Sequence, residues 1–448
     1  MDDFGDNAVS KAFFGEENIT KEQKKLAIKT RELIQDPKNN IGTFNDFEFA
    51  FNNPDKVATD KHIKAKRTLI NRSLQVQWIK AKTSKDAEKS FFRINGEATP
   101  INETEAIILK SREKPNAIAS RAIIHAGNAH KYWGKFKGKE VEIEKIATQI
   151  NKLLFEPELD PKIIHFPIAG NEYSTQSLEL VFGIVNMINN LDEINLKRKE
   201  LLKKESEEIK PPKDEDGDET LKYLNKVERI ISIIGGTKAS SLGLSPVIYF
   251  YSYRGRFQIT SFFAIVHLML QWDNERNNNP KSMIFQKFSA IRGKFEDFLL
   301  DYKNFITQAT LNVGSGIKSY KRLSELFSFI ITKLIEDVPP QQILEFIQLE
   351  QNFSFVKVFE AENRYNEERN PAGIRPPKET TVAVVINTFL KARILCPICS
   401  GHATFYSYNI DHILEIRNGG KANMENLQMG HFYCNEEKTK ILELKKTT

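Results

Sequence analysis

With 448 residues, the chain is too long for one ordinary core and is expected to form about two to four domains. Its 40% hydrophobic and 28% charged residues are typical of a soluble globular protein, and no apolar run is long enough to cross a membrane. The net charge of +6 allows a polyanionic partner without requiring one. Because the acidic N-terminus also lacks a signal-peptide pattern, we expect a cytoplasmic protein.

The first part of the chain is expected to be mostly helical, with one strand. Hydrophobic and polar residues alternate over most of Ser73–Lys80, which predicts a half-buried strand. Asn102-x-x-Glu105 is a capping box that opens a helix. The alanine-rich segment Asn116–Ala126 predicts a further helix that ends at Gly127.

One segment of this region resembles a known domain. Ser90–Ile101, followed by Glu105, is similar to the F-x-R-I-N-x-x-x-T-x-L segment of ParB-like domains, with Ile101 in place of the leucine. The resemblance covers roughly residues 60 to 140 and implies the N-terminal part of a modification-dependent restriction or phage-defence protein. An earlier D-G-Q-Q-R-like motif of the family is not found, and Met1 is expected to start beyond it. A remnant domain, or a second protein that supplies the missing part, is therefore expected.

The middle of the chain is expected to be a helical domain over residues 141–340. Apolar stripes such as Ile143, Ile146 and Ile150 are most simply core. Twelve of the 17 residues in Lys203–Glu219 are charged, which predicts a solvated linker or exposed loop. Residues 341–378 are expected to be a connector, since the end of this stretch holds several prolines and a glycine.

Two basic features lie within this helical region. The aromatic run Val247–Tyr253 leads into Arg254 and Arg256, a pairing that suits phosphate contact with base stacking. The alternative is a buried segment that leaves the core through a basic turn. Arg292, with two nearby lysines, is expected to lie on a solvated helix face.

All three cysteines lie in the last 58 residues, within a spacing typical of a metal site. Cys396-x-x-Cys399 and His431-x-x-Cys434 form two pairs separated by 31 residues, which predicts a closed, structural Zn²⁺ site. His402 is a rival fourth ligand, but it lies too close to Cys399 for the usual knuckle geometry. A module of about 55 residues has little core of its own, so we expect zinc to supply its stability.

Between and after these pairs come further polar residues in a recognisable order. They are Asp411-His412, Gly419-Gly420, Asn426-Leu427 and Asn435-x-x-Lys438. Together with the cysteine pairs, this order is similar to the zinc-containing branch of the HNH endonucleases, with His431 at a position where a cysteine is usual. The resemblance implies a ββα-metal module. The local pattern agrees, since the alternation over Thr404–Ile410 predicts a strand that ends at Asp411-His412 and Asn435–Lys446 is expected to be a helix with Leu442 inward.

The resemblance also implies a role for each residue in phosphodiester hydrolysis. His412 is the expected general base, since neutral imidazole can accept a proton from water near pH 7. Asp411 and Asn435 are expected to hold one Mg²⁺ or Mn²⁺ ion through hard oxygen donors. Asn426 is expected to fix the catalytic loop, and Lys438, on the same helix face as Asn435, to contact a phosphate.

Taken together, the sequence predicts a mostly helical α+β multidomain protein with a C-terminal ββα-metal module and a structural zinc. The expected domains are residues 1–140 (partial ParB-like), 141–340 (helical), 341–378 (connector) and 379–448 (nuclease). The expected activity is metal-dependent cleavage of DNA in bacterial restriction or phage defence. The alternatives are a non-catalytic zinc scaffold that binds DNA within a defence complex, and an RNA-cleaving enzyme of the same kind.

Overall fold

The computed structural model of the chain divides into two units, residues 1–94 and 95–448. The structure describes residues 102–128, 131–160, 165–172, 174, 176–252, 254–314, 316–356 and 378–447. All of these belong to the second unit. The strand expected over Ser73–Lys80 and the ParB-like segment Ser90–Ile101 lie outside the described residues.

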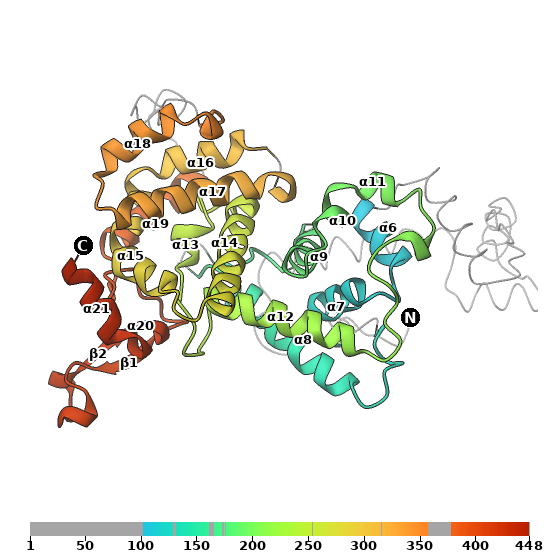
Figure 1. Cartoon of the computed structure of the whole chain (residues 1–448), viewed down its shortest axis with the longest axis horizontal. Coiled ribbons are helices and arrows are strands. Elements are labelled where there is room, and N and C mark those ends of the chain that lie inside the picture. Colours follow the sequence, from blue (N-terminus) through green and yellow to red (C-terminus); the bar gives the residue numbers. More distant parts are fainter. Residues whose placement is uncertain are drawn as a thin grey trace, which may run out of the picture. The chain divides into compact units, whose positions relative to one another are not determined.

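The described residues are mostly helical, with one small two-stranded sheet (Figure 1). No helix among them combines the length and apolar character that a membrane crossing requires. The elements are α6 (Glu103–Lys110), α7 (Pro115–Ile124), α8 (Glu140–Phe155), α9 (Ser177–Ile188), α10 (Asp192–Leu196), α11 (Arg198–Leu201), η2 (Ser206–Glu208), α12 (Asp218–Ile234), α13 (Pro246–Tyr249), α14 (Ile259–Asn278), α15 (Ile284–Asp301), α16 (Lys303–Asn312), α17 (Gly316–Ile335), α18 (Pro340–Leu349), η3 (Gln351–Phe353), α19 (Lys378–Lys391), β1 (Asn409–His412), η5 (Ile416–Asn418), η6 (Met424–Asn426), β2 (Leu427–Gly430), α20 (Phe432–Glu436) and α21 (Lys438–Thr447).

The helices from α7 to α12 form one packed group. α7 lies against α8, α9 and α12, and α12 also packs on α8. The apolar stripe of α8 faces this group, since Ile143 and Ile150 are fully buried and Ile146 is nearly so. The stripe is therefore core, as its helical spacing predicts.

The charged segment between α11 and α12 is an exposed loop with fixed anchors. Most of its charged residues are exposed, but Asp214 is buried and accepts hydrogen bonds from the backbone N–H groups of Gly217 and Thr220 at 2.9 and 2.8 Å. Lys114 Nζ donates to the carbonyl of Ile209, and Lys110 Nζ donates to that of Lys204. These bonds hold the loop against the preceding helices.

A second group of helices surrounds an aromatic core. α14 and α15 both pack on α17, and their phenylalanines, including Phe263 and Phe295, are fully buried. The run that begins at Val247 is buried through Tyr251, and its chain then turns at Arg254–Arg256. The structure therefore contains the buried segment and basic turn that sequence reasoning held as the alternative to a stacking surface.

Candidate functional site

The C-terminal segment forms a short hairpin followed by two helices. β1 pairs antiparallel with β2, and Asp411 lies opposite Gln428. The strand begins at Asn409, so the expectation of a strand from Thr404 is wrong; Thr404 instead forms an isolated bridge with Ser407. The helix expected over Asn435–Lys446 is also interrupted, because α20 ends at Glu436 and α21 begins at Lys438. Asn435 and Lys438 therefore belong to different helices.

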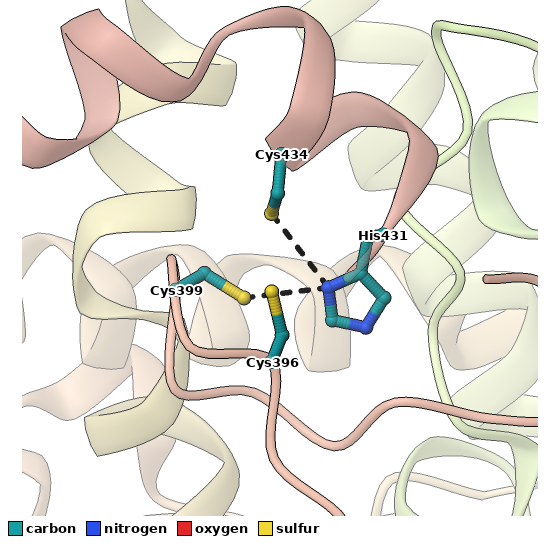
Figure 2. Close-up of side chains that lie close together, drawn as sticks. All are labelled: Cys396, Cys399, His431 and Cys434. Atoms are coloured by element: carbon teal, nitrogen blue, oxygen red, sulfur yellow. Dashed lines mark hydrogen bonds between the residues drawn. The ribbon is translucent and has the colours of Figure 1, made fainter. Parts of the chain in front are cut away.

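The four predicted zinc ligands lie together (Figure 2). The ligand atoms of Cys396, Cys399, His431 and Cys434 are all within 4.8 Å of one another, and all four residues are buried. The Nδ1 atom of His431 lies 3.4 Å from Cys399 Sγ and 3.6 Å from Cys434 Sγ. Two ligands on one tetrahedral zinc are about 3.8 Å apart, so three thiolates and one imidazole in this arrangement fit Zn²⁺.

The surroundings of the cluster favour metal binding. Hydrogen bonds among the three thiols lower the pKa of Cys396 and raise that of Cys434, so one thiol of the cluster is readily converted to the thiolate, the form that binds a metal. His431 Nε2 lies 3.0 Å from the carbonyl oxygen of His402. In the tautomer with its proton on Nε2, the ring donates to that carbonyl and the Nδ1 lone pair is available to a metal ion.

His402, the rival ligand, is not part of the cluster. Its ring is buried and packs edge-on against Phe389, with 6.0 Å between the ring centroids. Burial lowers the pKa of His402 to about 4. His402 thus contributes its backbone carbonyl to the zinc site, while its imidazole stays in the core.

A buried ion pair on α15 lies next to the zinc cluster. Arg292 and Glu296 are each 1% exposed, and Arg292 Nε donates to Glu296 Oε1 at 2.7 Å. Burial acts to raise the pKa of Glu296, but the charge of Arg292 and the N–H of His402 outweigh it and hold this pKa below its ordinary value. The solvated helix face expected for Arg292 is therefore wrong.

This ion pair binds several backbone groups at once. Arg292 donates to the carbonyl oxygens of Leu242 at 2.5 Å and Gly243 at 3.0 Å. Glu296 Oε2 accepts from the N–H of His402 at 2.5 Å. The pair therefore connects the zinc knuckle, the loop before α13 and helix α15.

Other contacts also join the knuckle to the helices. Gly293 N donates to the carbonyl of Cys399 at 3.2 Å, and a Cβ on Gly293 would lie only 2.7 Å from Ser400 Cβ. The N–H of Tyr433 donates to the carbonyl of Ser241 at 3.0 Å. The C-terminal module thus shares a core with the helical region, in addition to any stability that zinc supplies.

Asp411 lies at the end of the hairpin and is already paired. Its side chain is 4% exposed, and Oδ2 accepts from Lys438 Nζ at 2.9 Å and from Gln428 Nε2 at 2.7 Å. Lys438 Nζ also donates to the carbonyls of His412 at 2.5 Å and Ile413 at 3.0 Å. These bonds direct the amine of Lys438 toward the protein. Its expected contact with a phosphate therefore stays a prediction.

His412 and Asn435 retain free hydrogen-bonding capacity. The Nε2 atom of His412 is buried, and none of the described residues hydrogen-bonds to it. The side-chain amide of Asn435 likewise makes no hydrogen bond within the part of the chain that the structure describes, and it follows the zinc ligand Cys434 directly. The carboxylate of Asp411 and the amide oxygen of Asn435 are hard oxygen donors of the type that Mg²⁺ or Mn²⁺ prefers.

Asn426 closes the loop between the two strands. Its Oδ1 accepts from the N–H of Leu414 at 2.7 Å, and its Nδ2 donates to the carbonyls of Leu414 at 3.0 Å and Lys421 at 2.9 Å. Gly419 has a φ of +85°, and a Cβ on Gly420 would lie 1.7 Å from the Leu414 oxygen. Only glycine fits at position 420 without movement of this loop.

The predicted basic residues Arg254 and Arg256 lie on a different element from the residues described above. Arg254 and Arg256 are exposed in a turn that packs on α19, where a Cβ on Gly255 would lie 2.7 Å from Val382 Cγ1. Sequence reasoning missed Glu296 and Gln428. The pairing of Gln428 with Asp411 could have been found from the register of the hairpin, whereas no pattern in the sequence shows that Glu296 is buried.

Comparison with known proteins identifies the C-terminal segment. Residues 396–440 match the family model described as HNH endonuclease. No match is found among curated proteins or among solved structures. The matched segment begins at the first zinc ligand and includes Asp411, His412 and Asn435, so the chain carries an HNH endonuclease domain around the site described above.

Proposed function

We propose that the HNH domain is a metal-dependent endonuclease that hydrolyses DNA phosphodiester bonds. The observation that carries this proposal is the buried, unbonded Nε2 of His412 beside Asp411 at the end of β1. A zinc ribbon that only binds nucleic acid needs the cysteine pairs but not this combination. Cytoplasmic location and a role in bacterial restriction or phage defence are proposed on the sequence resemblance alone.

The proposed chemistry assigns proton transfer to His412. Its neutral imidazole accepts the proton of the attacking water, which then forms the new bond to phosphorus while the 3′ oxygen leaves. Mg²⁺ or Mn²⁺ supplies charge stabilisation for the phosphate and the leaving oxygen when it is bound. Asp411 and Asn435 would hold this ion, and the Cys396, Cys399, His431 and Cys434 set would hold Zn²⁺ as a structural ion.

Neighbouring side chains position these groups. Gln428 and Lys438 fix the Asp411 carboxylate, and Lys438 also holds the backbone carbonyl of His412. Asn426 holds the backbone of Leu414, two residues after His412. We expect loss of Asn426 to affect His412 through the loop rather than through contact with substrate.

The test is cleavage by a His412→Ala variant. Plasmid DNA, single-stranded DNA and RNA are incubated with Mg²⁺ or Mn²⁺, and zinc content is measured on the same samples. We expect loss of DNA cleavage with zinc unchanged. Met424→Ala is the matched control, because Met424 is 93% exposed in the same loop region. Full cleavage by His412→Ala would refute the mechanism, and cleavage of RNA alone would support the RNA-cleaving alternative.

A further inference from the structure

Three aromatic side chains are exposed together just before the catalytic strand. Phe405, Tyr406 and Tyr408 are 63%, 48% and 40% exposed. Among the residues that the structure describes, they are the only Phe, Tyr or Trp side chains with this degree of exposure. Aromatic side chains are usually half-buried or buried, so a cluster of three exposed rings indicates a binding surface.

The residue between these rings is firmly anchored. Ser407 is buried, and its Oγ donates to the carbonyl of Gly236 at 2.6 Å. The loop before α13 packs on the same residue, since a Cβ on Gly243 would lie 2.9 Å from both Ser407 oxygens. The aromatic rings are therefore presented by a fixed segment, which lowers the entropy lost when a ligand binds them.

The aromatic segment runs directly into the proposed catalytic residues. Tyr408 immediately precedes β1, and His412 ends it. Alternate residues of an extended chain face the same side, and the exposure of Tyr408 and Ile410 against the burial of Asp411 agrees with this alternation. Four residues of extended chain span about 13 Å, so Tyr408 lies within a few nucleotides of His412.

A basic turn is connected to the same segment through His165 and Phe166. The rings of Tyr406 and His165 meet edge to face, with 5.5 Å between their centroids. The next residue, Phe166, reaches the turn at Gly255, where a Cβ would lie 3.9 Å from Phe166 Cε1. Arg254 and Arg256 of this turn are exposed. Two exposed arginines therefore flank the glycine that lies against Phe166, the neighbour of the residue on which Tyr406 packs.

We propose that this aromatic segment, with the basic turn, binds an unpaired DNA strand and delivers it to His412. Exposed aromatic rings stack on bases, but in a duplex both faces of each base are already covered by its neighbours. Arginines bind the phosphates that accompany each base. The proposal rests on the proposed nuclease function and names its substrate: single-stranded DNA, or DNA with an unpaired segment.

Binding is tested separately from cleavage. Fluorescence anisotropy measures the Kd of the full chain for a labelled 20-nucleotide single strand and for the matching duplex, with no divalent ion added. We expect Phe405→Ala and Tyr408→Ala each to weaken single-strand binding by about fivefold or more, and duplex binding by less than about twofold. Tyr408→Phe keeps the ring and should bind as the unaltered chain does. Val141→Ala, at a 77% exposed position on α8, is the control.

Phe405→Leu distinguishes base stacking from protein docking, since leucine keeps an apolar surface but has no ring. We expect it to lose binding as Phe405→Ala does. Unchanged single-strand binding by both alanine variants would overturn the proposal. It would also be overturned if these variants lost self-association but kept DNA binding, because the rings would then bind protein instead of DNA. Arg254→Gln with Arg256→Gln should reduce the slope of log K against log salt by about 1.4. An unchanged slope would show that the basic turn is not part of the DNA-binding surface.

These outcomes do not depend on catalysis. If His412→Ala still cleaves DNA while the aromatic variants lose binding, the proposed mechanism fails and the binding surface stands. If His412→Ala abolishes cleavage while the aromatic variants bind normally, only the substrate proposal fails.

Discussion

Replacement of Arg292 by methionine should lower the affinity of the protein for zinc, and by more than the loss of a typical surface charge would. The change removes the partner of Glu296, which is 1% exposed and ionised. It also leaves the carbonyls of Leu242 and Gly243 without their donor. Removing one partner of a buried ion pair costs about 3–5 kcal/mol, because the other charge stays buried and unpaired.

The expected size follows from how the pair contacts the zinc site. Glu296 binds the N–H of His402, whose carbonyl accepts from His431. If most of the lost free energy is expressed at the metal site, 3 kcal/mol corresponds to about 150-fold weaker zinc binding. The assay follows zinc release to a chromogenic chelator from the purified full chain, together with its circular dichroism.

The double variant Arg292→Met with Glu296→Gln gives the decisive comparison. It removes both charges. The hydroxyl of Tyr249 donates to Glu296 Oε1 at 3.0 Å and the N–H of His402 to Oε2, and a glutamine can still accept one of these hydrogen bonds. We expect the double variant to hold zinc better than Arg292→Met alone, because no unpaired charge remains in the core. Equal zinc release from the unaltered chain and Arg292→Met would refute this reasoning. Release from the double variant as fast as from Arg292→Met would show that hydrogen bonding, rather than charge, is what matters.

Three further predictions test other contacts. Cys434→Ser should lower bound zinc below one ion per chain by elemental analysis, and unchanged zinc would contradict the ligand set. Gly420→Ala places a Cβ 1.7 Å from the Leu414 oxygen, so DNA cleavage should fall at least tenfold, by about 1.4 kcal/mol of activation free energy, while zinc content stays unchanged. Burial lowers the pKa of Lys303 to about 7, below its unfolded value, so the unfolded chain binds more protons between these two values. The free energy of unfolding relative to Lys303→Met should therefore rise from pH 7 to pH 10, and a constant difference in urea titrations would count against the shift.

The zinc ligands could be predicted from the sequence because local spacing largely determines their geometry. The two ligands of each pair, Cys396 with Cys399 and His431 with Cys434, are only three residues apart. The two pairs then have to meet in a single long-range contact. Asp411 and His412 could likewise be placed at a strand end, since β1 ends at His412. The exact limits of the strand and the break at Glu437 were missed, because short elements depend on tertiary contacts more than on propensity.

Residues Arg292 and Glu296 show why the rest could not be predicted. Four residues apart on a helix, they have the spacing of an ordinary surface ion pair. Their burial depends on the knuckle at Cys399–His402, more than 100 residues further along the chain. No local pattern encodes that contact, so the sequence alone favoured a solvated face. The same limit applies to Ser407, whose anchor at Gly236 is 171 residues away.

The positions of the metal ligands along the chain connect zinc binding to the proposed chemistry. Asn435 directly follows Cys434, and β2, which pairs with the strand of Asp411, ends one residue before His431. Zinc bound by this cluster would therefore hold β2 and α20, next to the proposed metal ligands Asp411 and Asn435. Because the knuckle also packs on α15 through Arg292 and Glu296, the helical region constrains these elements from the other side. In the proposed mechanism, zinc and the helical region therefore act by positioning His412 and Asp411 on β1 and Asn435 on α20.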